Sequence, residues 1–180
     1  MKKMIMAVAI VCAAALANAA SVGWSLGGAS AYAGDAYKFF VIGQNNVADI
    51  ATVTSLLNAG TDVSSYQYGA GNIASTGAAN QPYGTSGKTL GAGSYEAFFV
   101  VFDSASPTAG KSNYAVISGV STLKKTLTDS TPSVTFAGGN AGTVLNNASN
   151  WQSFGSVPEP TSGLLLLLGM AGLALKRKVA

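Results

Sequence analysis

The chain has 180 residues, of which 9% are charged and 48% hydrophobic, and its formal net charge at pH 7 is +3. It contains no histidine and one cysteine, which excludes a Ser-His-Asp triad, a Cys-His pair and a histidine-ligated zinc site. Half of the ten basic residues lie at the two ends, and residues 20–156 hold five lysines against six acids, a net charge of −1. The basic charge therefore does not indicate nucleic-acid binding.

The first 19 residues have the pattern of a secretory signal peptide. Lys2 and Lys3 precede an uncharged apolar run over residues 4–17, which ends in the small-x-small step Ala17-Asn18-Ala19. We expect signal peptidase to recognise Ala17 and Ala19 and to cleave after Ala19. A buried N-terminal helix is the alternative, although core helices seldom begin with a lysine pair and end at such a step. Cys12 lies in the apolar run, so the mature chain is expected to carry no thiol and no disulfide.

Residues 20–156 are expected to form one exported domain, long enough to build a hydrophobic core. Two runs, AYKFFVIG at 36–43 and SYEAFFVVFDS at 94–104, are apolar at successive positions, which is typical of central strands covered on both faces. Residues 113–120 and 132–139 predict further strands. Residues 121–128 (STLKKTLT) predict a weaker strand, suited to a sheet edge.

One amphipathic helix is predicted within residues 45–60, between the first two of these strands. Asn46 would cap the helix, Asp49 would lie in its first turn, and Gly60 would end it. The predicted apolar face consists of Val47, Ile50, Ala51, Thr54 and Leu57.

Residues 62–93 are rich in Gly, Ser and Asn and predict a long surface excursion with one strand near residues 66–70. The predicted fold class is thus α+β and β-rich. We expect a small sandwich or a partly closed barrel-like sheet with one amphipathic helix, together with an N-terminal signal helix and a C-terminal transmembrane helix.

The same excursion contains GTSGKT, whose Gly87, Lys88 and Thr89 match the end of a phosphate-binding loop. That motif requires another glycine five residues before Gly87, where this chain has Pro82. Neither a hydrophobic strand before the motif nor an amphipathic helix after it is predicted. An ordinary glycine-rich loop is therefore the preferred interpretation.

A pair of carboxylates could carry glycoside hydrolysis, and Glu96, Asp103 and Asp35 are the candidates near predicted strands. Each is more simply explained as a solvated residue at a strand edge or turn. No DxDxDG calcium loop is present. We expect no enzyme activity, no cofactor and no metal site.

The aromatic residues leave two interpretations open. Exposed Trp and Tyr side chains could stack on sugar rings, whereas buried ones would close the core. We expect Trp24 in the core and leave both possibilities open for the tyrosines of the 62–93 excursion. Asn147-Ala148-Ser149 matches a glycosylation sequon, which is weak evidence because so short a pattern occurs often by chance.

The C-terminal segment, residues 157–180, has three parts in order. Val157-Pro158-Glu159-Pro160 is followed by an apolar run over residues 164–175 and by the cations Lys176, Arg177 and Lys178. A helix over residues 164–175 would be about 18 Å long, and one over residues 161–175 about 23 Å. Both are short of the ~30 Å hydrocarbon core, so the helix would span a bilayer marginally, with local thinning. The three cations would stay cytoplasmic as a stop signal. A buried core helix is the alternative, disfavoured by the terminal position and the lack of a polar face.

Proline has no backbone donor and biases the preceding residue toward extended geometry, so Pro158-Glu159-Pro160 should stay extended just outside the bilayer. This tripartite order resembles the PEP-CTERM sorting signal of Gram-negative bacteria, also described as an ice-binding protein C-terminal domain. The resemblance covers residues 157–180 alone. It implies that exosortase, a membrane cysteine protease or transpeptidase of bacteria that typically make exopolysaccharide, recognises Pro158, Glu159 and Pro160.

Two classes of function remain open for the mature domain. The first is a non-enzymatic structural or interaction protein of the cell envelope or extracellular matrix, which would begin as an inner-membrane-anchored precursor. Its expected partners are signal peptidase, exosortase, the inner membrane and extracellular polysaccharide, with no nucleic acid. The second is a small extracytoplasmic carbohydrate-binding module or glycoside hydrolase that uses the loops of residues 62–93.

Overall fold

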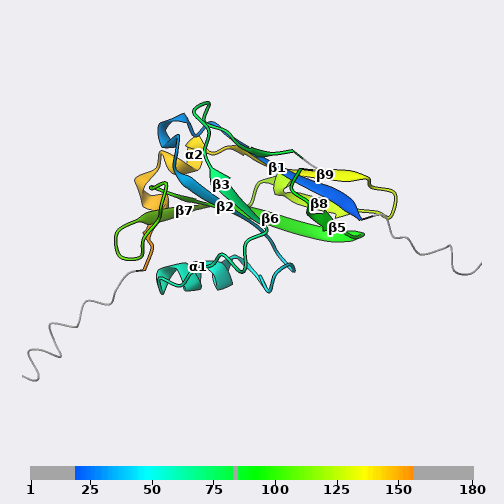
Figure 1. Ribbon diagram of the computed structural model, residues 1–180, viewed down its shortest axis with the longest axis horizontal. Coiled ribbons are helices and arrows are strands. Elements are labelled where there is room, and N and C mark those ends of the chain that lie inside the picture. Colours follow the sequence, from blue (N-terminus) through cyan, green and yellow to red (C-terminus); the bar gives the residue numbers. More distant parts are fainter. Residues whose placement is uncertain (1–18, 83–84, 156–180) are drawn as a thin grey trace, which may run out of the picture.

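The computed structural model describes residues 19–82 and 85–155 (Figure 1). The predicted signal peptide up to Asn18, the predicted transmembrane helix and the sorting motif lie outside these residues. Ala19 is exposed and directly precedes the first strand, β1 (Ala20–Gly27). The start of β1 and the C-terminal end of the described chain lie toward opposite ends of the long axis of the domain (Figure 1).

The strands form two sheets. In the β1 sheet, β9 (Ser133–Asn140) runs parallel to β1 along one edge, and β4 (Ala79–Gln81) and β5 (Thr89–Leu90) share the other edge in antiparallel orientation. The β6 sheet has the order β10-β7-β6-β2-β3, and all its pairs are antiparallel. Its strands are β2 (Ala36–Val41), β3 (Gly69–Asn72), β6 (Gly93–Phe102), β7 (Asn113–Ile117) and β10 (Trp151–Ser153).

The strand β8 (Lys124–Leu127) pairs with the first residues of β6. It lies on the same side of β6 as β7, which pairs with the last residues of that strand. The predicted STLKKTLT strand therefore forms in its second half, after the 3-10 turn Ser121–Leu123. The two sheets share no strand and are not closed into a barrel, so the domain is β-rich with one amphipathic helix, and the barrel alternative is wrong.

The β6 sheet lies between the β1 sheet and α1 (Figure 1). The core accordingly has two parts, one on each face of the β6 sheet. Phe39 of β2 and Phe99 of β6 face the β1 sheet, where Phe39 stacks on Trp24 of β1 with ring centroids 4.9 Å apart. Phe40 and Phe98 face α1 (Ile50–Asn58), and their rings stack at 5.0 Å. The prediction that these two strands are covered on both faces is confirmed.

The helix begins later than predicted. Asp49, not Asn46, is its N-cap, and the Asp49 carboxylate accepts from Thr52 N at 2.7 Å. Asn46 lies in the preceding turn with φ +63°. Because the helix starts at Ile50, its buried residues are Val53 and Leu57, and the prediction of Ala51 in the apolar face is wrong.

The 62–93 excursion contains three short strands, β3, β4 and β5, where one was predicted. The predicted strand near residues 66–70 corresponds to β3, which begins at Gly69. After β9 the chain forms a short helix, α2 (Gly142–Leu145), and the 3-10 turn Ala148–Asn150 before β10. A further 3-10 turn, Ser30–Tyr32, connects β1 to β2.

Candidate functional site

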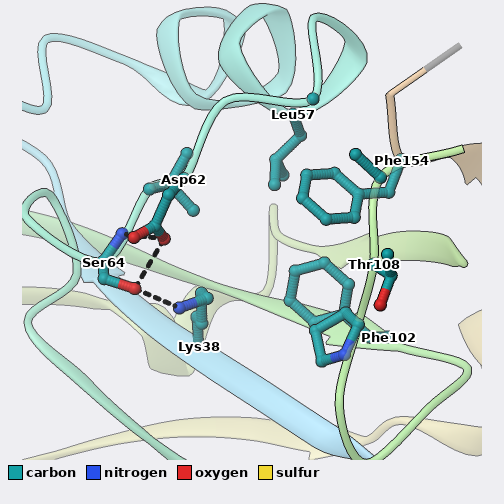
Figure 2. A pocket seen from close by; sticks show the side chains of 11 residues that line it. Lys38, Leu57, Asp62, Ser64, Phe102, Thr108 and Phe154 are labelled. Atoms are coloured by element: carbon teal, nitrogen blue, oxygen red, sulfur yellow. Dashed lines mark hydrogen bonds between the residues drawn. The ribbon is translucent and has the colours of Figure 1, made fainter. Parts of the chain in front are cut away.

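A pocket of about 410 Å³ opens between the end of α1, the segment that follows it and the β6–β7 loop (Figure 2). One side is polar and carries Lys38, Asp62 and Ser64 (Figure 2). The facing side is mainly apolar and carries Leu57, Phe102 and Phe154, with Thr108 beside the two phenylalanines (Figure 2). Val63, Pro107 and Ala109 also line the pocket. We call this hollow the exit pocket, because Phe154 and Gly155 lead from it toward the C-terminal segment.

Lys38 provides the only cation among the residues that line the exit pocket. It lies on the α1 face of β2, and its ammonium group donates to Ser64 Oγ at 3.0 Å and to Gln67 Oε1 at 2.8 Å. Burial lowers the pKa of the Lys38 ammonium group, and the nearby Asp62 carboxylate opposes that shift. The polar partners explain how a strand with so many buried positions tolerates a lysine.

Asp62 and Ser64 form a local turn beside this lysine. The Asp62 carboxylate accepts from Ser64 Oγ at 2.6 Å and from Ser64 N at 2.9 Å (Figure 2). These hydrogen bonds, with a smaller contribution from Lys38, hold the pKa of Asp62 below its usual value. An ionised Asp62 with a lowered pKa is a poor proton acceptor, and Ser64 accepts a hydrogen bond from Lys38. The three side chains therefore order the loop and present fixed polar groups at the pocket.

A second pocket, of about 390 Å³, lies over β6 and β8 and contains Glu96. Glu96 forms an ion pair with Lys124 on the neighbouring strand at 3.3 Å and is the only carboxylate among the residues that line this pocket. The structure thus does not pair Glu96 with an aspartate there.

The other two carboxylate candidates, Asp35 and Asp103, come together at adjoining ends of β2 and β6. Asp103 accepts from Asn113 N at 2.8 Å and from Asn113 Nδ2 at 2.7 Å, which fixes the start of β7. Partial burial raises the pKa of Asp35, with a further contribution from the Asp103 charge. Neither residue lines the two pockets described above.

The aromatic side chains belong largely to the core. Trp24 is buried as predicted, and its Nε1 donates to Tyr37 Oη at 3.2 Å. Tyr68 is buried and donates to the Thr89 carbonyl at 2.9 Å, and desolvation raises the pKa of Tyr68 to about 12. Tyr66 is half-buried against the α1 side of the core. Of the described tyrosines, Tyr37, Tyr68 and Tyr114 are buried, and Tyr32, Tyr66 and Tyr95 are half-buried.

Two other sequence motifs have structural explanations. Lys88 is followed by β5 rather than by a helix, and its ammonium group lies 5.5 Å from the centroid of the Tyr68 ring, so the phosphate-loop interpretation is wrong. The Asn147 side chain accepts from Ser149 N at 3.1 Å and from Ser149 Oγ at 2.8 Å, which caps the 3-10 turn.

The exit pocket was not predicted from the sequence. Two signals could have indicated it: a lysine inside a strand predicted to be buried, which needs polar partners, and the Asp-x-Ser turn of residues 62–64. Within residues 19–82 and 85–155, no three candidate metal ligands cluster together. The helices in this described part of the chain are too short or too polar to cross a bilayer.

The predicted recognition residues Pro158, Glu159 and Pro160 lie outside the described residues, as do Ala17, Lys176, Arg177 and Lys178. A family profile described as the PEP-CTERM protein-sorting motif matches residues 156–178. No curated protein and no solved structure matches the chain significantly. The C-terminal segment is therefore a PEP-CTERM sorting motif, which marks the chain for export as a membrane-anchored precursor and for sorting through exosortase to the cell envelope.

Proposed function

We propose that this chain, which carries a PEP-CTERM motif directly after its folded domain, is a non-enzymatic structural or interaction protein of the cell envelope or extracellular matrix. The observation that supports it most is the position of the motif. The match begins at residue 156, one residue after the last described residue of the domain. The sorting motif thus follows the folded domain directly in the chain, as is expected of a protein that is sorted through its C-terminal segment.

The composition of the domain supports the same proposal. Residues 20–156 contain no cysteine and are near neutral, and the described part folds as two sheets with an apolar core on each face of the β6 sheet. Such a domain needs neither an oxidising compartment nor a bound metal to build its core. It can therefore persist outside the cell whatever the local redox conditions.

The proposal is tested by expressing the full-length chain, with an epitope in the exposed turn of residues 128–131, in two otherwise identical hosts, one with exosortase and one without. We expect a shortened, surface or extracellular form in the first host and an intact membrane-bound precursor in the second. Immunoblots of fractionated cells measure both forms. Equal processing in both hosts would contradict sorting through exosortase.

The second candidate function is a carbohydrate-binding module, and the exit pocket is the observation that favours it. An apolar wall beside fixed hydroxyl, carboxylate and ammonium groups suits a sugar, which has both apolar and hydrogen-bonding faces. We expect replacement of Lys38 by methionine to weaken binding to a soluble polysaccharide by roughly tenfold, as loss of one charged hydrogen bond would.

This candidate is tested by affinity measurements of residues 20–156 against a panel of neutral and acidic polysaccharides. Lys88→Met is the matched control, because it removes the same charge from an exposed lysine that does not line the exit pocket. No detectable binding by the unaltered domain, or equal losses in the two variants, would reject the module.

A further inference from the structure

The last two described residues are fixed to the domain by backbone hydrogen bonds. Phe154 N donates to the Ser112 carbonyl at 2.9 Å, and the Phe154 carbonyl accepts from Gly110 N at 2.7 Å. Gly155 N donates to the Leu57 carbonyl at the end of α1, at 2.8 Å. The Phe154 ring packs edge-on against Phe102 with centroids 5.6 Å apart (Figure 2). The chain is therefore anchored to the core as far as Gly155.

Three small residues, Gly60, Ala109 and Gly155, pack closely against one another where the chain leaves the domain. A Cβ atom on Gly155 would lie 2.7 Å from Ala109 Cβ and 3.0 Å from Gly60 Cα, and both glycines have positive φ, +65° and +70°. The three backbones can approach this closely only because no larger side chain separates them. The point at which the chain leaves the domain therefore has a fixed position beside the exit pocket.

Covalent geometry then limits how far the sorting motif can be from this exit. Pro158 is the third residue after Gly155, and three residues span at most about 11 Å at ~3.6 Å per residue. This limit holds for any conformation of the intervening residues. An enzyme that grips Pro158, Glu159 and Pro160 must consequently reach within about 11 Å of the domain surface around Gly155.

That surface offers a protein partner both polar and apolar contacts. We define it as the exit surface: Gly60, Asp62, Ser64, Thr108 and Ala109 around the mouth of the exit pocket. Exposed polar groups form its rim, and Leu57 and Phe154 form part of the apolar interior, an arrangement that suits an apolar side chain inserted from a partner. Anionic lipid headgroups fit less well, because Asp62 lies beside Lys38, the only cation that lines the pocket.

From these observations we propose that the folded domain docks through the exit surface onto the sorting enzyme while the enzyme holds the PEP-CTERM motif. This inference rests on the proposed function, since it requires exosortase to process the chain. The enzyme then binds its substrate at two places, the exit surface of the domain and the sorting motif. Docking adds a second contact at a short, fixed distance from the first, which raises the effective concentration of the motif at the enzyme.

Two variants of the full-length precursor test this in the host with exosortase. The first inserts about a dozen Gly and Ser residues between Gly155 and Ser156, a spacer with a typical end-to-end distance of about 20 Å. It leaves the domain, its anchor and the motif unchanged but uncouples their positions. The second, Thr108→Arg, adds bulk to an exposed residue of the exit surface. We expect each variant to slow precursor processing roughly tenfold in a pulse-chase immunoblot.

The matched control is Thr135→Arg, which makes the same change at an exposed position of β9, outside the exit surface. We expect it to be processed at the unaltered rate, and we expect both arginine variants to keep the melting temperature of the unaltered domain. A normal or increased rate for either the spacer variant or Thr108→Arg overturns the docking proposal. Faster processing of Thr108→Arg together with slower processing of Thr108→Glu would also overturn it, in favour of contact with anionic headgroups. Processing in the host without exosortase would instead contradict sorting through exosortase, on which this inference rests.

Discussion

Replacing Gly69 by alanine should lower the free energy of unfolding by about 1–3 kcal/mol, the usual penalty for overpacking a core. A glycine-to-alanine change at an unstrained position ordinarily raises stability, by about 0.4–1 kcal/mol, because it restricts the unfolded chain. At Gly69 the added Cβ atom would overlap the outer ring atoms of Trp24. The indole ring cannot move aside cheaply, because it stacks on Phe39 at 4.9 Å and donates to Tyr37 at 3.2 Å.

Urea denaturation of residues 20–156 measures this effect. Gly91→Ala is the matched control, since no atom lies within 4 Å of a Cβ built at that exposed glycine. In a Trp24→Phe background the outer ring atoms are gone, and Gly69→Ala should destabilise the domain less. Equal effects of the two alanine substitutions in the unaltered background would show that the Trp24–Gly69 contact does not hold β3 in place.

This contact explains why the sequence indicated some strands and not others. The strands β2 and β6 were predicted because both their faces are apolar, and that pattern is visible within a few consecutive residues. The strand β3, with the sequence GAGN, has no β-branched or aromatic residue. It forms where a small residue is needed under Trp24, which lies 45 residues earlier in the chain.

The architecture of the β1 sheet was equally inaccessible from local patterns. β1 and β9 are parallel neighbours separated by more than 100 residues, and their register brings Trp24 opposite Phe136. Parallel strands are joined by a long crossover connection and not by a hairpin turn. The sequence therefore contains no turn signal that would indicate the pairing of β1 with β9. The helix was predicted correctly in type, but its start was not, because Asn46 and Asp49 are both good capping residues and Asn46 is taken up by the preceding turn.

The exit pocket could be inferred in part. A lone lysine in the run AYKFFV requires polar partners, but the sequence does not say that Ser64 and Gln67, 26 and 29 residues further on, supply them. The anchoring of Phe154 and Gly155 depends on backbone groups from α1 and the β6–β7 loop, which leave no compositional signal. The sorting motif, in contrast, is readable because its information lies in consecutive residues.

Replacing Pro158, Glu159 and Pro160 together with alanine is expected to abolish processing, so that the intact precursor accumulates in the inner membrane fraction of a host with exosortase. Alanine removes both fixed proline torsions and restores two backbone donors. It also removes Glu159, which is the only charged residue between Gly155 and Lys176 and so the only charged handle that an enzyme can recognise there. The apolar run over residues 164–175 is unchanged, so membrane insertion should persist.

Two comparisons separate recognition of the motif from membrane anchoring. Val157→Ala should be processed normally, because it keeps the prolines and the charge. Deletion of Lys176, Arg177 and Lys178 should instead weaken retention or orientation, because the positive cytoplasmic stop is lost while the recognition residues remain. Immunoblots of fractionated cells, with the epitope in the turn of residues 128–131, measure all four forms. If the triple-alanine precursor is processed and released like the unaltered protein, the enzyme does not recognise Pro158, Glu159 and Pro160, and the C-terminal segment acts only as a hydrophobic anchor.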